Sequence, residues 1–255
     1  MRKKYLGEKI VFVICYLLFV ICAYAQTKLD VVVIDAGHGG KDPGTIGDKT
    51  GVQEKNIVLP VSVKLGALIE KKFPSVKVIY TRVTDEFIEL KDRTKIANDS
   101  RAKLFISIHA NHKKLEESEK NGFEIYIINQ ERLPEAVLIT MKENKIISYK
   151  QSGTDSADTF IFSSLAQAGY NRFSEYIASN IETSMLNYSR LASRGIMQAG
   201  FWVILGASMP AVLVETGYLS DINDEKYLSS DTGQSDVAIA LFNAFQTYKM
   251  IYESQ

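Results

Sequence analysis

The sequence predicts a single α/β domain with a mostly parallel central sheet of about six strands and helices on both faces. Three observations predict it. Short apolar runs typical of strands buried on both faces alternate with longer stretches of helical periodicity. No internal repeat, proline-rich linker or compositional break divides the 255 residues. The composition is 46% hydrophobic and 24% charged, which is ordinary for a globular protein and excludes a disordered or fibrous chain.

The charge is balanced, with 30 basic and 30 acidic residues, so the basic excess of a nucleic-acid-binding protein is missing. At the N-terminus, basic residues precede an apolar run from Ile10 to Ala23, and an Ala-Tyr-Ala sequence ends at Ala25. This pattern is typical of a secretory signal peptide spanning residues 1–25. A membrane anchor is the alternative, but the run is shorter than the ~20 residues of a spanning helix.

Cleavage after Ala25 would change the net charge and the cysteine content of the exported chain, residues 26–255. It removes four basic residues and Glu8, leaving 26 basic and 29 acidic residues and a formal charge of −3. It also removes Cys15 and Cys22, the two cysteines of the chain. A disulfide scaffold is therefore excluded for the periplasmic or extracellular protein, and any metal site must use His, Asp or Glu.

The first half of the chain begins with the apolar strand Val31–Ile34, followed by a glycine-rich loop from Gly37 to Gly51. Glu54 opens a helix whose apolar residues recur at helical spacing. Pro60 lies inside this pattern and predicts a kink or a later start. The next elements are predicted as strands at Val76–Tyr80, Leu104–Ile108 and Phe123–Ile128 and a helix at Leu90–Arg101.

The second half begins with the least regular stretch, Asn129–Asn171, in which Leu133–Lys142 has a helical pattern and residues 152–156 form a loop. Regular periodicity then returns. The remaining elements are predicted as helices at Asn171–Asn187 and Val237–Tyr252 and strands at Phe201–Leu205 and Ala211–Val214.

Chemistry-bearing side chains gather at the predicted strand ends. His38 follows the first strand, and His109 ends the strand that begins at Leu104. Glu54 stands at the far side of the glycine-rich loop, and Glu215 directly follows a buried strand. The carboxyl ends of parallel strands face one crevice, where ligands usually bind. We therefore expect these four side chains to meet.

Two histidines and two carboxylates at one sheet edge can build a hydrolytic zinc site. A catalytic zinc ion takes three such ligands and leaves a position for water. A further carboxylate then moves the proton. His38, Glu54 and His109 fit the ligand roles, and Glu215 fits the base. Each also has an ordinary alternative: a structural histidine, a carboxylate at a helix N-terminus, or a strand end that meets water.

Four ordered motifs span most of the chain after residue 25. They are Val33–Gly44 (VIDAGHGGKDPG), Glu54, Ser107–Asn111 (SIHAN) and Pro210–Ser220 (PAVLVETGYLS). Together they resemble the zinc-dependent N-acetylmuramoyl-L-alanine amidases, and the segment from residue 129 to 171 resembles the cell-separation type of that family. Thr81-Arg82 and the stretch around Arg93 also match the pattern of that family.

The resemblance implies an enzyme that hydrolyses the amide between the lactyl group of N-acetylmuramic acid and L-alanine in peptidoglycan. It implies one zinc ion held by His38, Glu54 and His109, with Glu215 as the catalytic carboxylate. Asp221 departs from the family, which usually has Asn at this position behind Glu215.

Three further residues, Arg82, Asn111 and His112, are expected near the substrate. His112 is outside the ligand set of the family. The segment from residue 129 to 171 lies where cell-separation members carry an insertion that occludes zinc until an activator protein displaces it. Glu143 is the first candidate for an autoinhibitory ligand in this segment, and a surface excursion without a regulatory role is the alternative.

Other functions remain open. Another zinc amidohydrolase, or a carboxypeptidase acting on a different wall peptide, would use the same fold. A non-catalytic wall-binding module would not need Glu215. A phosphate-binding loop at Gly37–Gly44 is excluded, because its glycine spacing fits neither nucleotide-binding pattern. Peptidoglycan is the expected partner, with no nucleic acid and no stable membrane anchor after cleavage.

Overall fold

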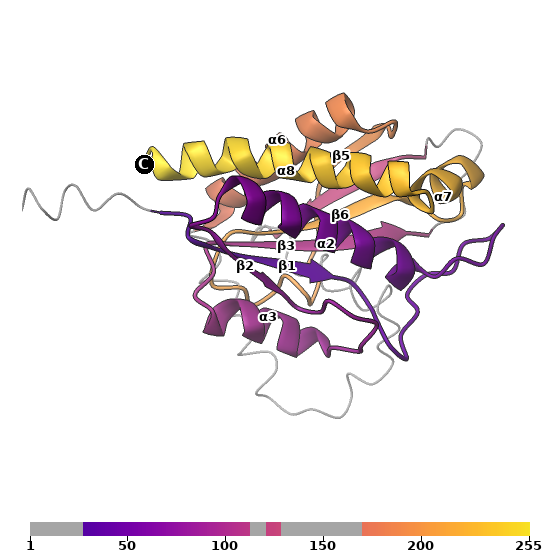
Figure 1. Ribbon diagram of the computed structural model, residues 1–255, viewed down its shortest axis with the longest axis horizontal. Coiled ribbons are helices and arrows are strands. Elements are labelled where there is room, and N and C mark those ends of the chain that lie inside the picture. Colours follow the sequence, from indigo (N-terminus) through magenta and orange to yellow (C-terminus); the bar gives the residue numbers. More distant parts are fainter. Residues whose placement is uncertain (1–27, 113–120, 129–169) are drawn as a thin grey trace, which may run out of the picture.

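A computed structural model of the chain describes residues 28–112, 121–128 and 170–255. These residues form an α/β domain around one six-stranded sheet (Figure 1). The elements in chain order are β1 (Val31–Ala36), α2 (Glu54–Lys72), β2 (Lys77–Tyr80), α3 (Leu90–Asp99), β3 (Leu104–Asn111), β4 (Phe123–Ile127), α6 (Asn171–Tyr188), β5 (Ser193–Gln198), β6 (Ala211–Tyr218), α7 (Ile222–Leu228) and α8 (Asp231–Glu253).

The strands lie in the order β2-β1-β3-β6-β4-β5. Strands β2, β1, β3 and β6 are mutually parallel. Strand β4 runs antiparallel to β6, and β5 is parallel to β4. The predicted mostly parallel sheet of six strands is therefore confirmed, with the reversed pair at one edge.

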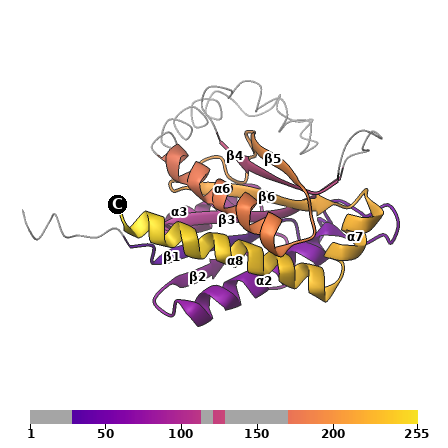
Figure 2. The ribbon, with the colours of Figure 1, turned by 90° about the horizontal axis from the view of Figure 1, so that it is seen from above.

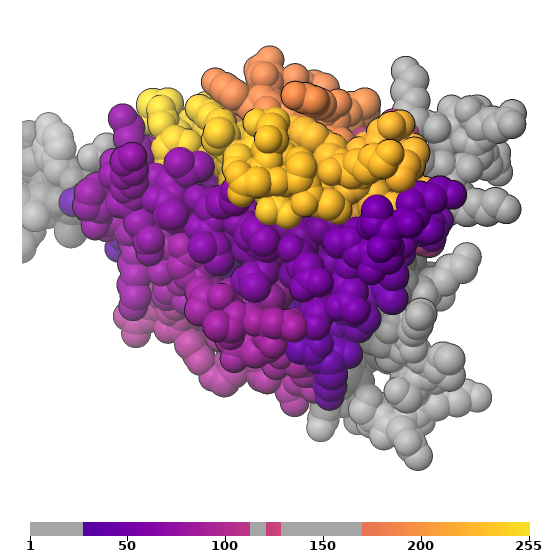
Figure 3. Space-filling model, turned by 45° about the vertical axis from the view of Figure 1, so that its right-hand side comes forward, coloured from indigo at the N-terminus to yellow at the C-terminus, as the bar shows by residue number. Residues whose placement is uncertain are grey.

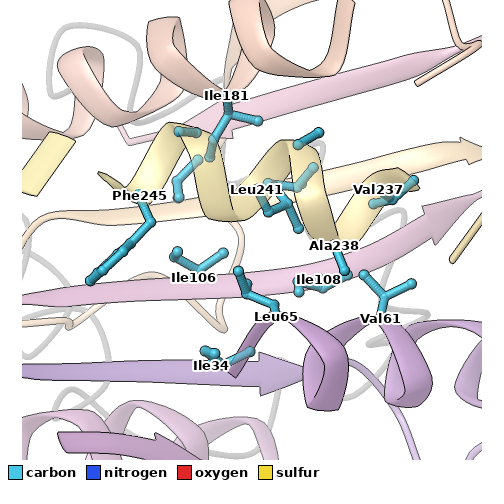
Figure 4. Packing of buried hydrophobic residues seen from close by; sticks show 14 of the residues in the cluster. Ile34, Val61, Leu65, Ile106, Ile108, Ile181, Val237, Ala238, Leu241 and Phe245 are labelled. Carbon is cyan, nitrogen blue, oxygen red and sulfur yellow. The ribbon is translucent and has the colours of Figure 1, made fainter. Parts of the chain in front are cut away.

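One face of the sheet, called here the three-helix face, is covered by α2, α6 and α8 (Figure 2). Alternate strand residues such as Val32, Ile34 and Ile106 point to this side. Figure 4 shows Leu241 and Phe245 of α8 directed toward these strands. From outside, α8 and the N-terminal half of the chain form one continuous surface (Figure 3).

The opposite face, called here the α3 face, is covered by α3 and the irregular residues 199–209. Val33, Phe105 and Leu213 point to this side, each one residue away from a side chain on the three-helix face. Helices thus lie on both faces, as predicted, but within the described residues one face has a single helix and a segment without regular structure.

The predicted strand at Phe201–Leu205 is wrong. The backbone N–H groups of Ile204 and Leu205 both donate to the carbonyl of Phe201, which closes a turn. The residues are apolar because they fill the core under the α3 face, where Ile204 is fully buried. A short apolar run reports burial and does not by itself distinguish a strand from other buried structure.

Strand β5 and helix α7 are not predicted from the sequence. Strand β5 (SRGIMQ) lies at the sheet edge and has no alternation of apolar and polar residues, so it carries no strand pattern. Helix α7 is short, but its start has a clear signal in Asp221. The side chain of Asp221 accepts hydrogen bonds from the backbone N–H groups of Asn223 and Asp224 as an N-cap.

Several boundaries differ from the predictions. Helix α2 begins at Glu54 and continues through Pro60, so a later start is wrong. Helix α8 begins six residues before Val237, at Asp231, and Ser230 caps it. Strands β3 and β6 continue past the apolar runs, so His109 and Glu215 lie inside strands. None of the helices in the described ranges is long and apolar enough to cross a membrane.

Two predicted features lie outside the described residues. The first is the signal peptide at residues 1–25. The second is most of the segment from residue 129 to 171, including Glu143. Both stay predictions.

Candidate metal centre and active site

His38 lies in the loop that follows β1, in a tight reversal of the chain. Its φ of 58° is in the left-handed region, which only a few non-glycine residues adopt. Gly39 and Asp42 close the reversal with reciprocal backbone hydrogen bonds of 2.9 and 3.0 Å. The Nδ1 atom of His38 lies 2.8 Å from Asp42 Oδ2. Asp42 thus orients the ring and leaves Nε2 to face Glu54, a supporting role that the sequence analysis missed.

Glu54 is the first residue of α2, and its carboxylate lies between the two histidines. Its Oε2 is 3.0 Å from His38 Nε2, and its Oε1 is 2.9 Å from His109 Nδ1. Backbone N–H groups of Thr45 and Ala110 donate one hydrogen bond to each oxygen, both at 2.9 Å. The carboxylate is 4% exposed, and these contacts hold it in one orientation.

His109 comes from β3, and its ring lies directly over Gly37. A Cβ atom at residue 37 would be 2.4 Å from His109 Cε1, so only glycine fits below the ring. The Nε2 atom of His109 is buried and has no hydrogen-bond partner among the described residues. Burying a ring nitrogen without a hydrogen-bond partner costs free energy. A bound cation would remove this cost, because the nitrogen lone pair could then serve as a metal ligand.

His38, Glu54 and His109 together form a candidate metal centre, as the sequence predicts. Their ligand atoms all lie within 4.8 Å of one another. Two imidazole nitrogens and one carboxylate are the donor set of many catalytic zinc sites, so these residues fit such an ion. The cluster brings two strand ends and one helix start to a single point.

The charges of this cluster favour a cation. Burial would lower the pKa of His38, but the carboxylates of Glu54 and Asp42 outweigh it and raise the value to about 10. Burial would likewise raise the pKa of Glu54, but the two histidines hold it far below its usual range. The cluster therefore attracts positive charge strongly, whether as a proton or as a metal ion.

Glu215 lies on β6 beside this cluster. In the parallel register of β3 and β6, its Cα pairs with that of His109, so the two residues are about 4.8 Å apart across the sheet. The hydroxyl of Thr216 donates to the carbonyl of His109 at 2.9 Å, which joins the two strands at this level. Glu215 is 7% exposed. It is therefore a buried carboxylate beside the candidate metal centre.

A second carboxylate, Glu124, lies across from Glu215 on the antiparallel strand β4. It is buried and accepts hydrogen bonds from four side chains. It is a lone acidic residue between apolar neighbours in a strand, a signal that could have singled it out. Its donors are Tyr126 Oη at 2.7 Å, Arg194 Nε at 2.8 Å, Asn111 Nδ2 at 3.0 Å and Tyr218 Oη.

Asn111 and His112 lie at the end of β3. The Nδ2 of Asn111 is turned toward Glu124, and its Oδ1 accepts from the backbone N–H of His112 at 2.7 Å. The Nε2 of His112 is 2.8 Å from Oδ1 of Asp48, an exposed residue of the glycine-rich loop. His112 thus lies outside the three-residue cluster, as expected. Substrate contact by Asn111 and His112 stays a prediction.

Arg82 is buried beneath the loop that carries His38, and its place near the substrate stays a prediction. It is 2% exposed, and its guanidinium donates to the backbone carbonyls of Ala36 and Gly37. The side chain therefore supports the loop that carries His38.

The sequence profile of N-acetylmuramoyl-L-alanine amidases matches residues 32–247. The chain belongs to this family. Within it, N-acetylmuramoyl-L-alanine amidase AmiC of Escherichia coli is 29% identical over 226 residues, which cover 86% of this chain and 52% of that protein. The chain spans about half the length of the first curated relatives that it matches.

Solved structures of the family have the same fold. The amidase AmiC2 of Nostoc punctiforme is 30% identical with a TM-score of 0.60, over 86% of this chain and 96% of that one. The CwlD amidase of Clostridioides difficile, solved in complex with the GerS lipoprotein, is 23% identical with a TM-score of 0.65, over 87% and 99%. The second likeness shows the fold alone.

The departure at Asp221 has a structural explanation. Asp221 caps α7, and it also accepts a hydrogen bond from Asn121 Nδ2 at 2.9 Å. Asp and Asn are about equally good N-caps, because each offers a side-chain oxygen to the first N–H groups of a helix. The change from the usual Asn therefore preserves the local structure behind Glu215.

Proposed function

We propose that this chain is a zinc-dependent amidase of peptidoglycan. It would cut the amide between the lactyl group of N-acetylmuramic acid and L-alanine, in wall remodelling or daughter-cell separation. The observation that carries the proposal is the cluster of His38, Glu54 and His109 with Glu215 beside it in register. Membership of the amidase family supports the choice of bond.

Each residue of the site has its own role in the proposed reaction. When bound, zinc supplies Lewis-acid activation of the scissile carbonyl and of water. Glu215 accepts the proton of the attacking water and delivers it to the leaving nitrogen of L-alanine. Its position next to His109 in the strand register supports this role. Glu54, held by two backbone N–H groups, keeps both histidines in place.

The test of the reaction is digestion of purified peptidoglycan, followed by mass spectrometry of the products. We expect stem peptides with a free L-alanine amino group. Release of C-terminal amino acids would instead show a carboxypeptidase, and binding without products would show a wall-binding module.

Glu215→Gln should retain zinc and lose about 10²–10⁴-fold in turnover, because it removes the proton carrier. Wild-type turnover of this variant would contradict the role of Glu215.

The test of the ligand set is metal content. His38→Ala and His109→Ala should each lose stoichiometric zinc after dialysis, because a site with two ligands is incomplete. His112→Ala is the matched control and should retain zinc, because His112 pairs with Asp48 outside the cluster. Full zinc content in either ligand variant would mean that the set is wrong.

Export follows from the proposed substrate, which lies outside the cytoplasmic membrane. The predicted signal peptide at residues 1–25 would direct it. N-terminal sequencing of the protein from the periplasmic or culture fraction should begin at Gln26. A start at Met1 in that fraction would contradict cleavage.

Regulation by a partner is the last part of the proposal. Glu143, in the segment from residue 129 to 171, would occupy the metal in a resting state until an activator protein displaces it. The complex of the CwlD amidase with the GerS lipoprotein is a precedent for a partner on this fold. Deleting residues 134–156 should raise the rate on soluble peptidoglycan fragments, with Glu143→Ala as the point variant. No gain with zinc content intact would contradict autoinhibition.

A further inference from the structure

Two buried arginines lie beneath the loop that carries His38. Arg93 on α3 is 1% exposed and Arg82, after β2, is 2% exposed. Burying two guanidinium groups side by side is unfavourable, and the proximity of Arg93, together with burial, lowers the pKa of Arg82. One carboxylate, Asp35, contacts Arg93 at 2.8 Å. Stability alone gives little reason for this arrangement, since apolar side chains of similar volume often serve as well.

The guanidinium groups bind three consecutive backbone carbonyls, from Ala36 at the end of β1 to His38 in the loop. Arg82 donates to Ala36 from Nε at 2.9 Å and to Gly37 from Nη2 at 2.7 Å. Arg93 donates to Ala36 from Nη1 at 2.7 Å and to His38 from Nη2 at 2.8 Å. The carbonyls before and after the Cα atom of His38, those of Gly37 and His38, are therefore held at fixed positions.

The backbone held in this way is strained. His38 has a φ of 58°, and among the described residues only Arg101 is another non-glycine residue with positive φ. Gly39 has a φ of 125°, and a Cβ atom there would lie 2.9 Å from Arg82 Nε. Strained backbone persists only where the surroundings determine it fully. Here the hydrogen bonds from the arginines do so.

We propose that Arg82 and Arg93 are positioning residues for the metal ligand His38. They hold its backbone in the left-handed conformation, so that its Nε2 points to Glu54 before any cation binds. Neither guanidinium contacts the ligand atoms in the contacts described above, so both act through the carbonyls of residues 36–38. This inference rests on the proposed zinc site and adds the residues that preorganise it.

The test replaces each arginine with lysine, which keeps the charge but cannot bind two carbonyls with a rigid fork. Zinc affinity is measured by competition with a chelator, and the stability of the metal-free protein by urea unfolding. We expect Arg82→Lys and Arg93→Lys to bind zinc about 10–100-fold more weakly, as for other residues that orient ligands. Saturating zinc should restore turnover with an unchanged KM. The matched control is Arg172→Lys on α6, an arginine on the opposite face of the sheet, with unchanged zinc affinity.

Two results would overturn the inference. One is wild-type zinc affinity in folded variants, even with reduced stability, which would make the arginines structural only. The other is a raised KM at saturating zinc, which would place Arg82 in contact with substrate. If Arg93→Lys does not fold, the test rests on Arg82→Lys. This variant is expected to fold, because the ion pair with Asp35 is made by Arg93 and stays intact. A wild-type chain without zinc affinity would refute the proposed function too, whereas unaffected variants of a zinc-binding chain refute this inference alone.

Discussion

The two faces of the sheet are built from alternate residues of the same strands, yet they differ in chemistry. On the three-helix face, the residues of β1, β3 and β4 are apolar from one end of each strand to the other. On the α3 face, charged or polar residues gather at one end of the sheet, which holds the carboxyl ends of β1, β3 and β6 and the amino end of the antiparallel strand β4. The polar residues of this face are Asp35 on β1, Ser107 and His109 on β3, Glu124 on β4 and Glu215 on β6.

The two faces therefore use the same strands differently: one packs hydrocarbon, and the other combines packing with buried polar contacts. The three-helix face buries hydrocarbon against α2, α6 and α8, which supplies most of the driving force for folding. The α3 face uses its strand ends to orient side chains through hydrogen bonds. A strand can serve both purposes because its successive side chains point to opposite faces. Substitutions on the two faces should therefore have different consequences.

The largest expected effect on stability is at the polar end of the α3 face. Asp35 is fully buried and accepts from Thr81, Ser107 and Arg93. Asp35→Ala leaves Arg93 without its countercharge, and we expect a loss of about 3–5 kcal/mol in the free energy of unfolding. Zinc affinity should fall as well, because Arg93 positions His38. Urea unfolding and chelator competition measure the two effects, and a loss of stability without loss of affinity would contradict the second.

On the three-helix face, Leu241→Ala should reduce stability only. Leu241 is fully buried on α8, and the loss of its side chain leaves a cavity that costs about 2–5 kcal/mol. Zinc affinity and turnover per folded molecule should stay at wild-type values at a temperature where the variant is folded. A change in either would show that the two faces are not independent.

Acid should remove the contribution of Asp35. Burial would raise the pKa of this carboxyl, but Arg93 and its hydroxyl donors hold the pKa below the usual 3.8. Its stabilising contribution is therefore complete above pH 3.8 and disappears as the pH falls through the folded-state value. The stability difference between wild type and Asp35→Ala should shrink below pH 3.8. A difference that stays constant there would contradict the assignment.

The smallest expected effect is at Asp221, outside both faces. Asp221→Ala should cost about 1 kcal/mol, because it removes the N-cap of α7. Asp221→Asn should be neutral to within about 0.5 kcal/mol, because Asn offers the same acceptor oxygen. Thermal unfolding of the pair measures both. A loss for Asn equal to that for Ala would mean that charge, and not capping, is what this position needs.

Local patterns in the sequence predict much of the fold and the metal cluster. The buried runs around Val32, Ile106 and Val212 have the continuous apolar character of central strands, and all three are strands. His38, Glu54 and His109 were expected to meet at the strand ends, and the structure brings them within 4.8 Å. The failures also have a local cause. Residues 201–205 are apolar without being a strand, and β5 is a strand without an apolar pattern.

By itself, the sequence determined the α/β class, the parallel central strands and the three residues of the cluster. It could do so because the periodicity of apolar residues, and the residues that directly follow an apolar run, can be read from a short stretch of sequence. Only the tertiary structure decided that β4 runs antiparallel beside β6, which sets Glu124 across from Glu215. Only it placed Arg82 under a carbonyl 46 residues away. Such contacts form between segments that are far apart in the sequence. The spacing of apolar and polar residues predicts which side chains are buried, but it does not predict which distant residue a buried charged group contacts.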